Sequence, residues 1–340
     1  MRRDASASLP AIPVIELGRG GPVALLEATR ERAEALLGTA QKRYPPFAIR
    51  FGDRLSRRWL GKAGNPYLGE ITEIAHHLGA PGAFFLNVSY EWGCTTAVVP
   101  NPSGGNRLLR ILDWPFDGLG AQVVAARFEA EAGPWINLTW PGFVGVVQAM
   151  APGRFAACFN QAPLRHRTGA FAADWTLERV AVWRKRALPP AHLLRLAFET
   201  CPDYAAAKRL LTETPLALPA IFLLSGTQPD EGCVIERLER RAFVLESPHA
   251  AANHWQTPGL RGRNRGTESE HRCRLMSGRM ATAADDLAWL TAPILNPTTR
   301  LALVAEAGSG SLTAVGIENE APATATLRLE GTKTDLRAAV

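Results

Sequence analysis

Three residues in the first third of the chain have types and spacing suited to chemistry on a carbonyl group: Cys94, Arg110 and Asp113. A cysteine attacks as its thiolate, so it needs a neighbour that takes its proton and groups that stabilise negative charge. Cleavage between Gly93 and Cys94 would give the cysteine a free α-amine, whose unperturbed pKa of about 7.7 to 8.0 leaves a useful neutral fraction near pH 7. Nucleophile and general base would then belong to one residue. In this interpretation Asp113 holds the new amine, and Arg110 supports the thiolate and the developing oxyanion.

The spacing of these residues resembles that of a known family. In the cysteine-nucleophile amidases that include choloylglycine hydrolases, penicillin V acylases, acid ceramidase and N-acylethanolamine-hydrolysing acid amidase, an arginine follows the nucleophile by 16 residues and an aspartate by 19. Cys94, Arg110 and Asp113 fall at the same spacing. The family motif is Arg-Asn-Leu-Asp-Tyr/Phe, and this chain departs from it at Ile111 and Trp114, neither of which replaces a catalytic group. A lone cysteine is more often a buried apolar residue, so the combination carries the interpretation.

The residues before the cysteine resemble one branch of that family. The run Asn87-x-x-Tyr90-Glu91 shortly before Cys94-Thr95-Thr96 is similar to acid ceramidase and the acid amidase. Members of that branch carry a long N-terminal segment that stays attached as a small subunit. The resemblance therefore implies that residues 1–93 form a helical small subunit, paired without a covalent link to a catalytic subunit of residues 94–340.

Two asparagines further along the chain are implied as oxyanion-hole residues by the same resemblance. Asn160 ends a stretch, Ala151–Asn160, that is similar to the family region in which an asparagine contributes to the oxyanion hole. Asn253, in Ala252-Asn253-His254-Trp255, resembles a Thr-Asn-His/Tyr element whose side-chain amide is the second donor.

A second family arginine falls in the region that begins at Ser269. Arg272 is the first choice for it, and Arg274 remains the alternative, because the alignment is ambiguous there. The run Ile294–Thr298 is similar to a late Leu-Asn-x-x-Thr element. The resemblance covers most of residues 67–317, and it is weakest over 165–245, where a substrate-binding wall could differ.

The elements that must position these residues are predicted from hydrophobic periodicity and turn signals. Helices are expected at Pro22–Tyr44, Tyr67–Leu78 and Pro190–Leu211, with a helix end at Asp285–Leu290; strands are expected within 82–161 and at 220–224, 233–239, 242–247, 300–305 and 312–317. Blocks of strands on either side of a helical block predict stacked sheets flanked by helices. The resemblance makes this expectation specific: an α+β protein with the four-layer αββα sandwich of N-terminal-nucleophile hydrolases and a helical N-terminal segment.

Composition narrows the class of partner and the location. The chain has 340 residues and a net charge of +6, which divides evenly between residues 1–93 and 94–340. No aromatic-studded basic stripe accompanies this thin excess, so nucleic-acid binding is disfavoured, and Arg261, Arg263 and Arg265 are expected to lie in a solvated loop. No apolar run is long enough for a membrane helix, and the start lacks the apolar region of a secretory signal, so a cytoplasmic location is expected.

Cofactor chemistry has little support in the sequence. The five cysteines are an odd number without CxxC spacing, which disfavours a disulfide framework or a zinc ribbon. Glu73 and His77 are four residues apart on a predicted helix, but a third ligand is not evident. Neither a metal nor a cofactor is therefore expected.

The function implied is hydrolysis of a linear amide through a thioester on Cys94. Four tryptophans near the site in sequence, Trp92, Trp114, Trp135 and Trp140, could line an apolar wall for an acyl chain. Together with the resemblance, they favour a fatty N-acyl amide of a small polar amine. Two alternatives stay open: transfer of the acyl group to an amine, and an uncleaved binding protein without catalysis. The acyl chain, the amine and the oligomeric state are left open.

Overall fold

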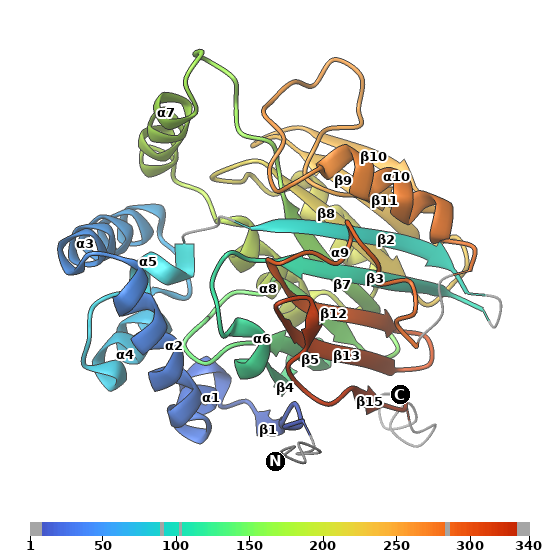
Figure 1. Ribbon diagram of the computed structural model, residues 1–340, viewed down its shortest axis with the longest axis horizontal. Helices are drawn as coiled ribbons and strands as arrows, with labels where there is room; N and C mark the ends of the chain where they lie inside the picture. Colours follow the sequence, from blue (N-terminus) through green and yellow to red (C-terminus); the bar gives the residue numbers. More distant parts are fainter. Residues whose placement is uncertain (1–8, 89–91, 102–103, 283–285, 332–340) are drawn as a thin grey trace, which may run out of the picture.

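Two β-sheets packed face to face form the centre of the molecule (Figure 1). The computed structural model describes residues 9–88, 92–101, 104–282 and 286–331. The larger sheet has the strand order β1 (Val14–Gly18), β4 (Val124–Ala130), β5 (Gly133–Thr139), β6 (Gln148–Ala151), β7 (Phe155–Gln161), β8 (Ala220–Gly226), β9 (Gly232–Arg237) and β10 (Ala242–Glu246). Neighbouring strands are antiparallel except β1 and β4, which are parallel.

The second sheet carries the strand that begins at the candidate nucleophile. Its order is β11 (His249–Ala251), β2 (Gly93–Pro100), β3 (Asn106–Asp113), β12 (Thr299–Glu306), β13 (Ser311–Glu318) and β14 (Ala321–Pro322), and β15 (Leu327–Leu329) also pairs with β13. All these pairs are antiparallel.

Helices cover the outer face of each sheet. Helices α8 (Pro190–Thr200) and α9 (Tyr204–Glu213) lie against the larger sheet, and α10 (Ser269–Arg279) lies against β2 and β11 of the second (Figure 1). The order of layers is therefore α, β, β, α, which confirms the predicted sandwich.

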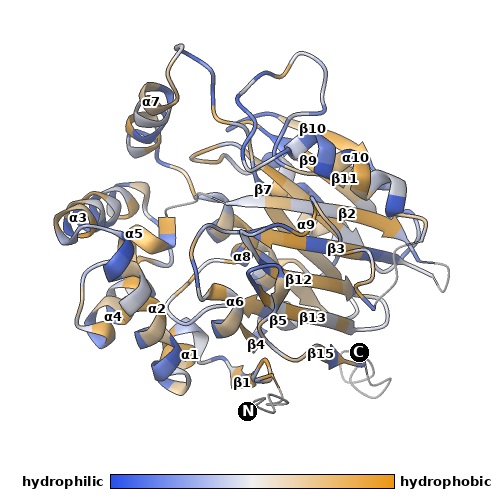
Figure 2. Cartoon of the chain, in the orientation of Figure 1, coloured by the Kyte–Doolittle hydropathy of each residue, from blue (hydrophilic) through white to orange (hydrophobic). Residues whose placement is uncertain are grey.

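The strands of the second sheet are apolar on both faces because both faces are covered. Along β2 and β3, Val98, Leu108 and Leu112 face the other sheet, whereas Leu109 and Ile111 face α10. Figure 2 shows hydrophobic colour along the central strands, in contrast to the mixed colouring of the helices. Burial of a large apolar side chain contributes about 1.5–3 kcal/mol, so the two-sided packing fixes the register of β2 against β3.

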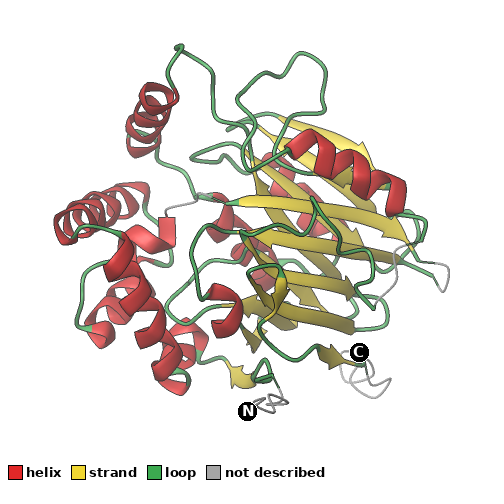
Figure 3. Cartoon of the chain, in the orientation of Figure 1, coloured by secondary structure: helices red, strands yellow, loops and turns green. Residues whose placement is uncertain are grey.

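The N-terminal helices gather beside one end of the sandwich (Figure 3). They are α1 (Gly21–Ala28), α2 (Arg30–Arg43), α3 (Pro46–Ala63), α4 (Leu68–Leu78) and α5 (Ala83–Val88). This confirms a helical N-terminal segment, but β1 shows that the segment also adds a strand to the larger sheet. None of the helices among the described residues is long and apolar enough to span a membrane. The cytoplasmic location expected from the sequence stays a prediction.

Several predicted elements have other bounds in the structure. The helix expected at Pro22–Tyr44 is broken at Thr29, whose backbone leaves the helical region (φ −133°, ψ 37°) and whose hydroxyl donates to the carbonyl of Leu25. The helical stretch expected at Pro190–Leu211 is two helices, because Asp203 caps α9 by accepting from the amide of Ala206.

The helix end expected at Asp285–Leu290 was wrong over its described part, which forms turns; Asp285 lies outside the described residues. The expectation of strands within 82–161 was wrong at α5 and at α6 (Leu119–Gln122), which are helices. The other elements that were not predicted are α3, α7 (Phe171–Trp183), α10, β1, β11, β14 and β15.

Candidate active site

The hairpin of β2 and β3 sets the positions of the three residues whose spacing suggested chemistry. In its register Cys94 pairs with Leu112, Thr96 with Arg110, and Gly93 with Asp113. Successive side chains of a strand point to opposite faces. Cys94 and Arg110 therefore face the space between the sheets, and Asp113 faces the side of α10.

The backbone of Cys94 is held on both sides by residues from distant parts of the chain. Its N–H donates to Oδ1 of Asn253 over 2.7 Å, and its carbonyl oxygen accepts from Nη1 of Arg272 over 2.6 Å. Arg272 also donates to Oδ1 of Asn253 over 3.1 Å. One arginine and one asparagine thus fix both polar backbone atoms of the candidate nucleophile.

Arg272 and Arg274 have opposite environments. Arg272 is 1% exposed, whereas the side chain of Arg274 is 70% exposed and lies 3.9 Å from Glu270. Residues two apart on a helix point in different directions, so α10 can present one of the two arginines to the site and leave the other in solvent. The structure places Arg272 at Cys94, and Arg274 at the surface.

Asp113 is a buried carboxylate that accepts from several donors. Its Oδ1 accepts from the hydroxyl of Thr299 over 2.8 Å, and its Oδ2 accepts from Arg272 over 3.3 Å. Burial raises the pKa of Asp113, while Arg272 and the hydrogen bond from Thr299 oppose that rise. Gly93 lies beside it, since a Cβ on Gly93 would be 3.4 Å from the Cβ of Asp113. The carboxylate is therefore close to the peptide bond that the sequence analysis expects to be cut.

Arg110 and Asn160 meet in the space between the sheets. Arg110 donates to the hydroxyl of Thr96 over 3.1 Å, to Oδ1 of Asn160, and to the carbonyl of Phe159 over 3.1 Å. The Nδ2 of Asn160 donates to the carbonyls of Ala251 and Ala252. These bonds tie β2, β7 and β11 together, so an oxyanion role for Asn160 stays a prediction.

Asn253 uses its amide in a way that the sequence did not indicate. Its Nδ2 donates to the carbonyl of Gln161 over 2.9 Å, and its Oδ1 takes the Cys94 amide. Its own backbone N–H donates to the hydroxyl of Ser269. Nδ2 carries two hydrogens, so the predicted oxyanion role would fall to the second.

The thiol of Cys94 is fully buried, and burial raises its pKa to about 12. Asp113 and Cys158 raise this pKa further, whereas Arg110 and Arg272 lower it. The thiol is therefore neutral at pH 7, and it can attack a carbonyl only if a nearby base takes its proton.

Thr299 and Gly266 belong to the site but were not singled out in the sequence. Thr299 follows directly after the run Ile294–Thr298, so that run was the available signal. Gly266 has a positive φ of 66°, and a Cβ there would lie 2.8 Å from Arg272 Nη2 and 3.2 Å from Gly93 Cα. Glycine alone permits the loop to approach the cysteine so closely.

Three of the four tryptophans form a continuous chain that starts near the cysteine. The ring centroids of Trp92 and Trp114 are 4.6 Å apart, and those of Trp114 and Trp140 are 5.9 Å apart. Trp135 is elsewhere, because it stacks on Phe198 of α8 at 5.4 Å.

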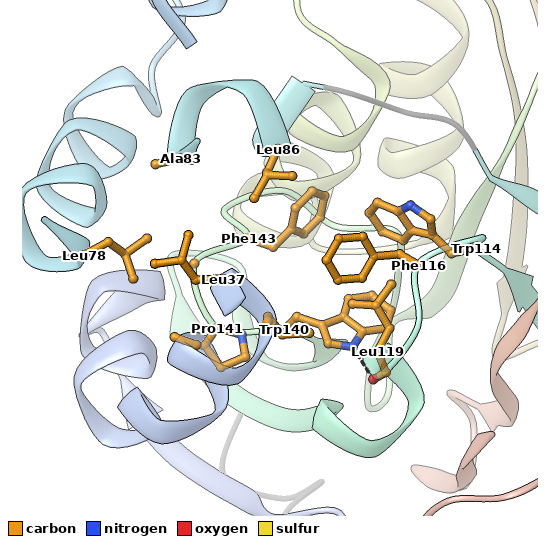
Figure 4. Close-up of a pocket in the computed structure, with 13 residues that line it drawn as sticks. Leu37, Leu78, Ala83, Leu86, Trp114, Phe116, Leu119, Trp140, Pro141 and Phe143 are labelled. Carbon is orange, nitrogen blue, oxygen red and sulfur yellow. Dashed lines mark hydrogen bonds between the residues drawn. The ribbon is translucent and has the colours of Figure 1, made fainter. Parts of the chain in front are cut away.

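The row of tryptophans ends at an apolar pocket between the N-terminal helices and the sandwich (Figure 4). The lining residues are almost all apolar: Ala33, Leu36, Leu37, Leu78, Ala83, Leu86, Trp114, Phe116, Leu119, Trp140, Pro141, Gly142 and Phe143. Trp114 directly follows Asp113, so one wall of the pocket is continuous with the site.

Other expectations fall on surface segments. Arg263 ion-pairs with Asp174 at 3.0 Å, and Arg265 donates to the carbonyl of Ala162, so the arginine loop is anchored rather than simply solvated. Tyr90 and Glu91 lie outside the described residues. In the described part of the chain, no three His, Cys, Asp or Glu side chains gather in a group that could hold a metal ion.

Two facing sheets between helical layers, with a buried cysteine at the start of an inner strand, define the N-terminal-nucleophile hydrolase fold. A solved structure with this fold, the Caenorhabditis elegans ortholog of N-acylethanolamine-hydrolyzing acid amidase, matches with a TM-score of 0.50 and 18% identity over 63% of this chain and 93% of that chain. No family model matches the chain.

Curated relatives extend the likeness to sequence. The acid ceramidase of Pan troglodytes is 30% identical over 117 residues, which are 34% of this chain and 28% of that protein. The N-acylethanolamine-hydrolyzing acid amidase of Cavia porcellus is 26% identical over 178 residues, which are 51% of this chain and 48% of that protein. The chain thus spans about half or less of the length of these relatives. Over these stretches the chain is similar to acid ceramidase and N-acylethanolamine-hydrolyzing acid amidase.

Proposed function

We propose that the protein is a self-processing amidase that hydrolyses fatty N-acyl amides of small polar amines, such as N-acylethanolamines or ceramide-like lipids. The observation that carries this proposal is the pair of hydrogen bonds by which Asn253 and Arg272 hold the backbone of the buried Cys94. The names of the relatives, an acid ceramidase and an amidase that hydrolyses N-acylethanolamines, support the substrate class.

The first step is cleavage of the chain itself. The Cys94 sulfur attacks the carbonyl carbon of Gly93, the C–N bond breaks, and the thiol proton goes to the departing nitrogen. A thioester joins Gly93 to the sulfur until water hydrolyses it. Residues 1–93 then end in a carboxylate, and residues 94–340 begin with a free α-amine. Gly93 suits this step because a side chain there would meet both Asp113 and Gly266, each 3.4 Å from the position of a Cβ.

Turnover uses the new amine as the base. The neutral α-amine takes the thiol proton as the sulfur attacks the substrate carbonyl, so that the buried cysteine, whose pKa is raised, need not form a free thiolate first. The second hydrogen of Asn253 Nδ2 donates to the oxyanion, the proton returns to the leaving amine, and water releases the acyl group from the thioester. Asp113 holds the ammonium form of the amine, and the charge of Arg110 favours the thiolate.

The apolar pocket supplies the place for the acyl chain. Its wall meets the site at Trp114, and its floor comes from both the N-terminal helices and the sandwich (Figure 4). Each methylene buried there contributes about 0.8 kcal/mol, so catalytic efficiency should rise with acyl length until the pocket is full.

An amide panel with Cys94→Ala as the control tests the proposal. The panel contains a series of N-acylethanolamines of increasing acyl length, glycocholate and penicillin V. Efficiency that rises with acyl length and vanishes in Cys94→Ala supports the fatty amide assignment. A flat profile, or preferred cleavage of glycocholate or penicillin V, refutes that assignment. Product analysis with a competing amine separates hydrolysis from acyl transfer, and an intact chain without turnover favours the binding protein.

A further inference from the structure

The side-chain amide of Asn87 bridges the N-terminal segment and the loop that carries much of the pocket wall. Asn87 lies on α5, is 1% exposed, and donates from Nδ2 to the carbonyl of Gly142 over 2.8 Å. Its Oδ1 accepts from the N–H of Val144 over 2.7 Å. One side chain thus satisfies an acceptor and a donor two residues apart, as a neighbouring strand would.

The loop held in this way is a tight turn. Trp140, Pro141, Gly142 and Phe143 form a turn closed by the N–H of Phe143 on the carbonyl of Trp140 over 3.1 Å, and Gly142 has a φ of +86°. Proline at the second position and a left-handed glycine at the third are typical of a type II turn. All four of these residues line the apolar pocket.

The opposite wall comes from the same helix as Asn87. Ala83 and Leu86 of α5 line the pocket, and Nδ2 of Asn87 also donates to the carbonyl of Ala83 over 2.9 Å. Figure 4 shows Leu86 and Phe143 on adjacent sides of the cavity. The width of the pocket between α5 and the turn therefore depends on the two bonds of Asn87 to the turn.

We propose that Asn87 is a positioning residue for acyl-chain selection, which fixes the Trp140–Phe143 turn against α5 and so sets the length of chain that the pocket accepts. The proposal rests on the proposed amidase function. Asn87 lies before the expected cut and the turn lies after it, so the bridge crosses between the two fragments. The small fragment then contributes to substrate choice, as well as to stability.

The experiment compares Asn87→Asp with the parent and with Asn65→Asp. Aspartate has the size of asparagine, but its carboxylate cannot donate to the carbonyl of Gly142. Asn65 is the matched control, because it is a buried amide of the same segment that bonds to Nδ1 of His192 over 2.8 Å and lines no part of the pocket. The measurements are kcat and KM for N-acylethanolamines with acetyl, octanoyl and palmitoyl groups.

We expect Asn87→Asp to lower kcat/KM for the palmitoyl amide by about tenfold, mainly through KM, because a displaced wall loses contacts with the chain. Turnover of the acetyl amide should stay within about twofold of the parent, since that substrate does not reach the turn. Asn65→Asp should keep the chain-length profile of the parent. An unchanged profile in folded Asn87→Asp, or an equal loss for all three amides, overturns the role of Asn87.

Gly142→Ala provides an independent disturbance of the same turn, should Asn87→Asp fail to fold. An alanine at a φ of +86° is strained, so the turn must shift while the N-terminal segment is unchanged. This variant must show the same selective loss of kcat/KM for the palmitoyl amide. If that loss is absent, the proposal is overturned. A parent protein that hydrolyses none of the amides refutes the amidase function, and the role of Asn87 with it. A parent with an acyl-length profile that neither variant alters refutes the role of Asn87 alone.

Discussion

The backbone nitrogen of Cys94 donates to Oδ1 of Asn253 over 2.7 Å, and the same oxygen accepts from Arg272. In the uncut chain this nitrogen belongs to a peptide bond. After the proposed cleavage it is the amine that takes the thiol proton. In this mechanism Asn253 already positions the Cys94 nitrogen in the uncut chain, so that little rearrangement is needed between processing and turnover.

Processing is expected to yield fragments of 93 and 247 residues from the chain of 340. The thiol must attack the carbonyl of Gly93, so Cys94→Ala should remain a single chain, and Cys94→Ser should be cut slowly. Denaturing mass spectrometry gives the two masses, and N-terminal sequencing should find Cys-Thr-Thr. Active protein in which that terminus is missing would contradict the mechanism.

Arg272→Gln and Arg274→Gln should have very different effects on processing and on turnover. Loss of Arg272 removes the donor to the Cys94 carbonyl and should lower both processing and turnover by about 100-fold or more. Arg274 is an exposed partner of Glu270, so its variant should stay within about twofold of the parent. Fragment formation and kcat/KM are measured beside melting temperatures. A folded Arg272→Gln that processes normally would exclude this arginine from the site.

The acid limb of the pH–activity profile should report the protonation of the Asp113 carboxylate. Burial raises its pKa, so the carboxyl takes up a proton at higher pH than an ordinary aspartate, and activity that requires the carboxylate is lost as the pH falls through that raised value. Thr299→Val removes the hydroxyl that stabilises the ionised form, which should shift the limb to still higher pH. Thr313→Val, at a buried threonine of β13, is the control. Superimposable profiles for Thr299→Val and the parent would show that the hydroxyl does not tune Asp113.

Filling the pocket should shorten the preferred acyl chain. Leu37 of α2 lines the cavity, so Leu37→Trp should lower kcat/KM for the longest acyl groups by about tenfold and spare short ones, because a few methylenes lose their place. Leu177→Trp makes the same change on α7, where Leu177 is 42% exposed, and it should not alter the preferred acyl length. The readout is kcat/KM across the acyl series. Unaltered selectivity in Leu37→Trp would place the acyl chain elsewhere.

The cysteine, arginine and aspartate were grouped by the spacing of the family motif, and that spacing corresponds to a hairpin in the structure. Gly93 pairs with Asp113 and Thr96 pairs with Arg110 across the adjacent strands β2 and β3. The number of residues between each pair therefore sets the register of the hairpin. Asn253 and Arg272 come from β11–α10, far along the chain, and no local pattern places them at Cys94. The family resemblance alone suggested them; both side chains contact the backbone of Cys94, and their catalytic roles stay predictions.

The missed elements had weaker or competing signals. The break at Thr29 carries no glycine or proline, and it arises because the threonine hydroxyl competes for the carbonyl of Leu25. Strand β1 has five residues and alternates only loosely, since its partner β4 supplies the pairing. Helix α3 was recognisable in principle, because Pro46 begins it and Gly64, in the left-handed region, ends it.

Gly93 is buried at the start of β2, directly opposite Asp113. Under the proposed cleavage, the first acyl group to occupy the site is the protein's own, and the first product is its N-terminal fragment. The carboxylate left on Gly93 would then lie where a substrate carbonyl must bind, so the end of the fragment would act as an inhibitor until it leaves the site. The proposal therefore predicts two events in maturation, cleavage and departure of the fragment's end, and a gain of activity that lags behind the appearance of the fragments.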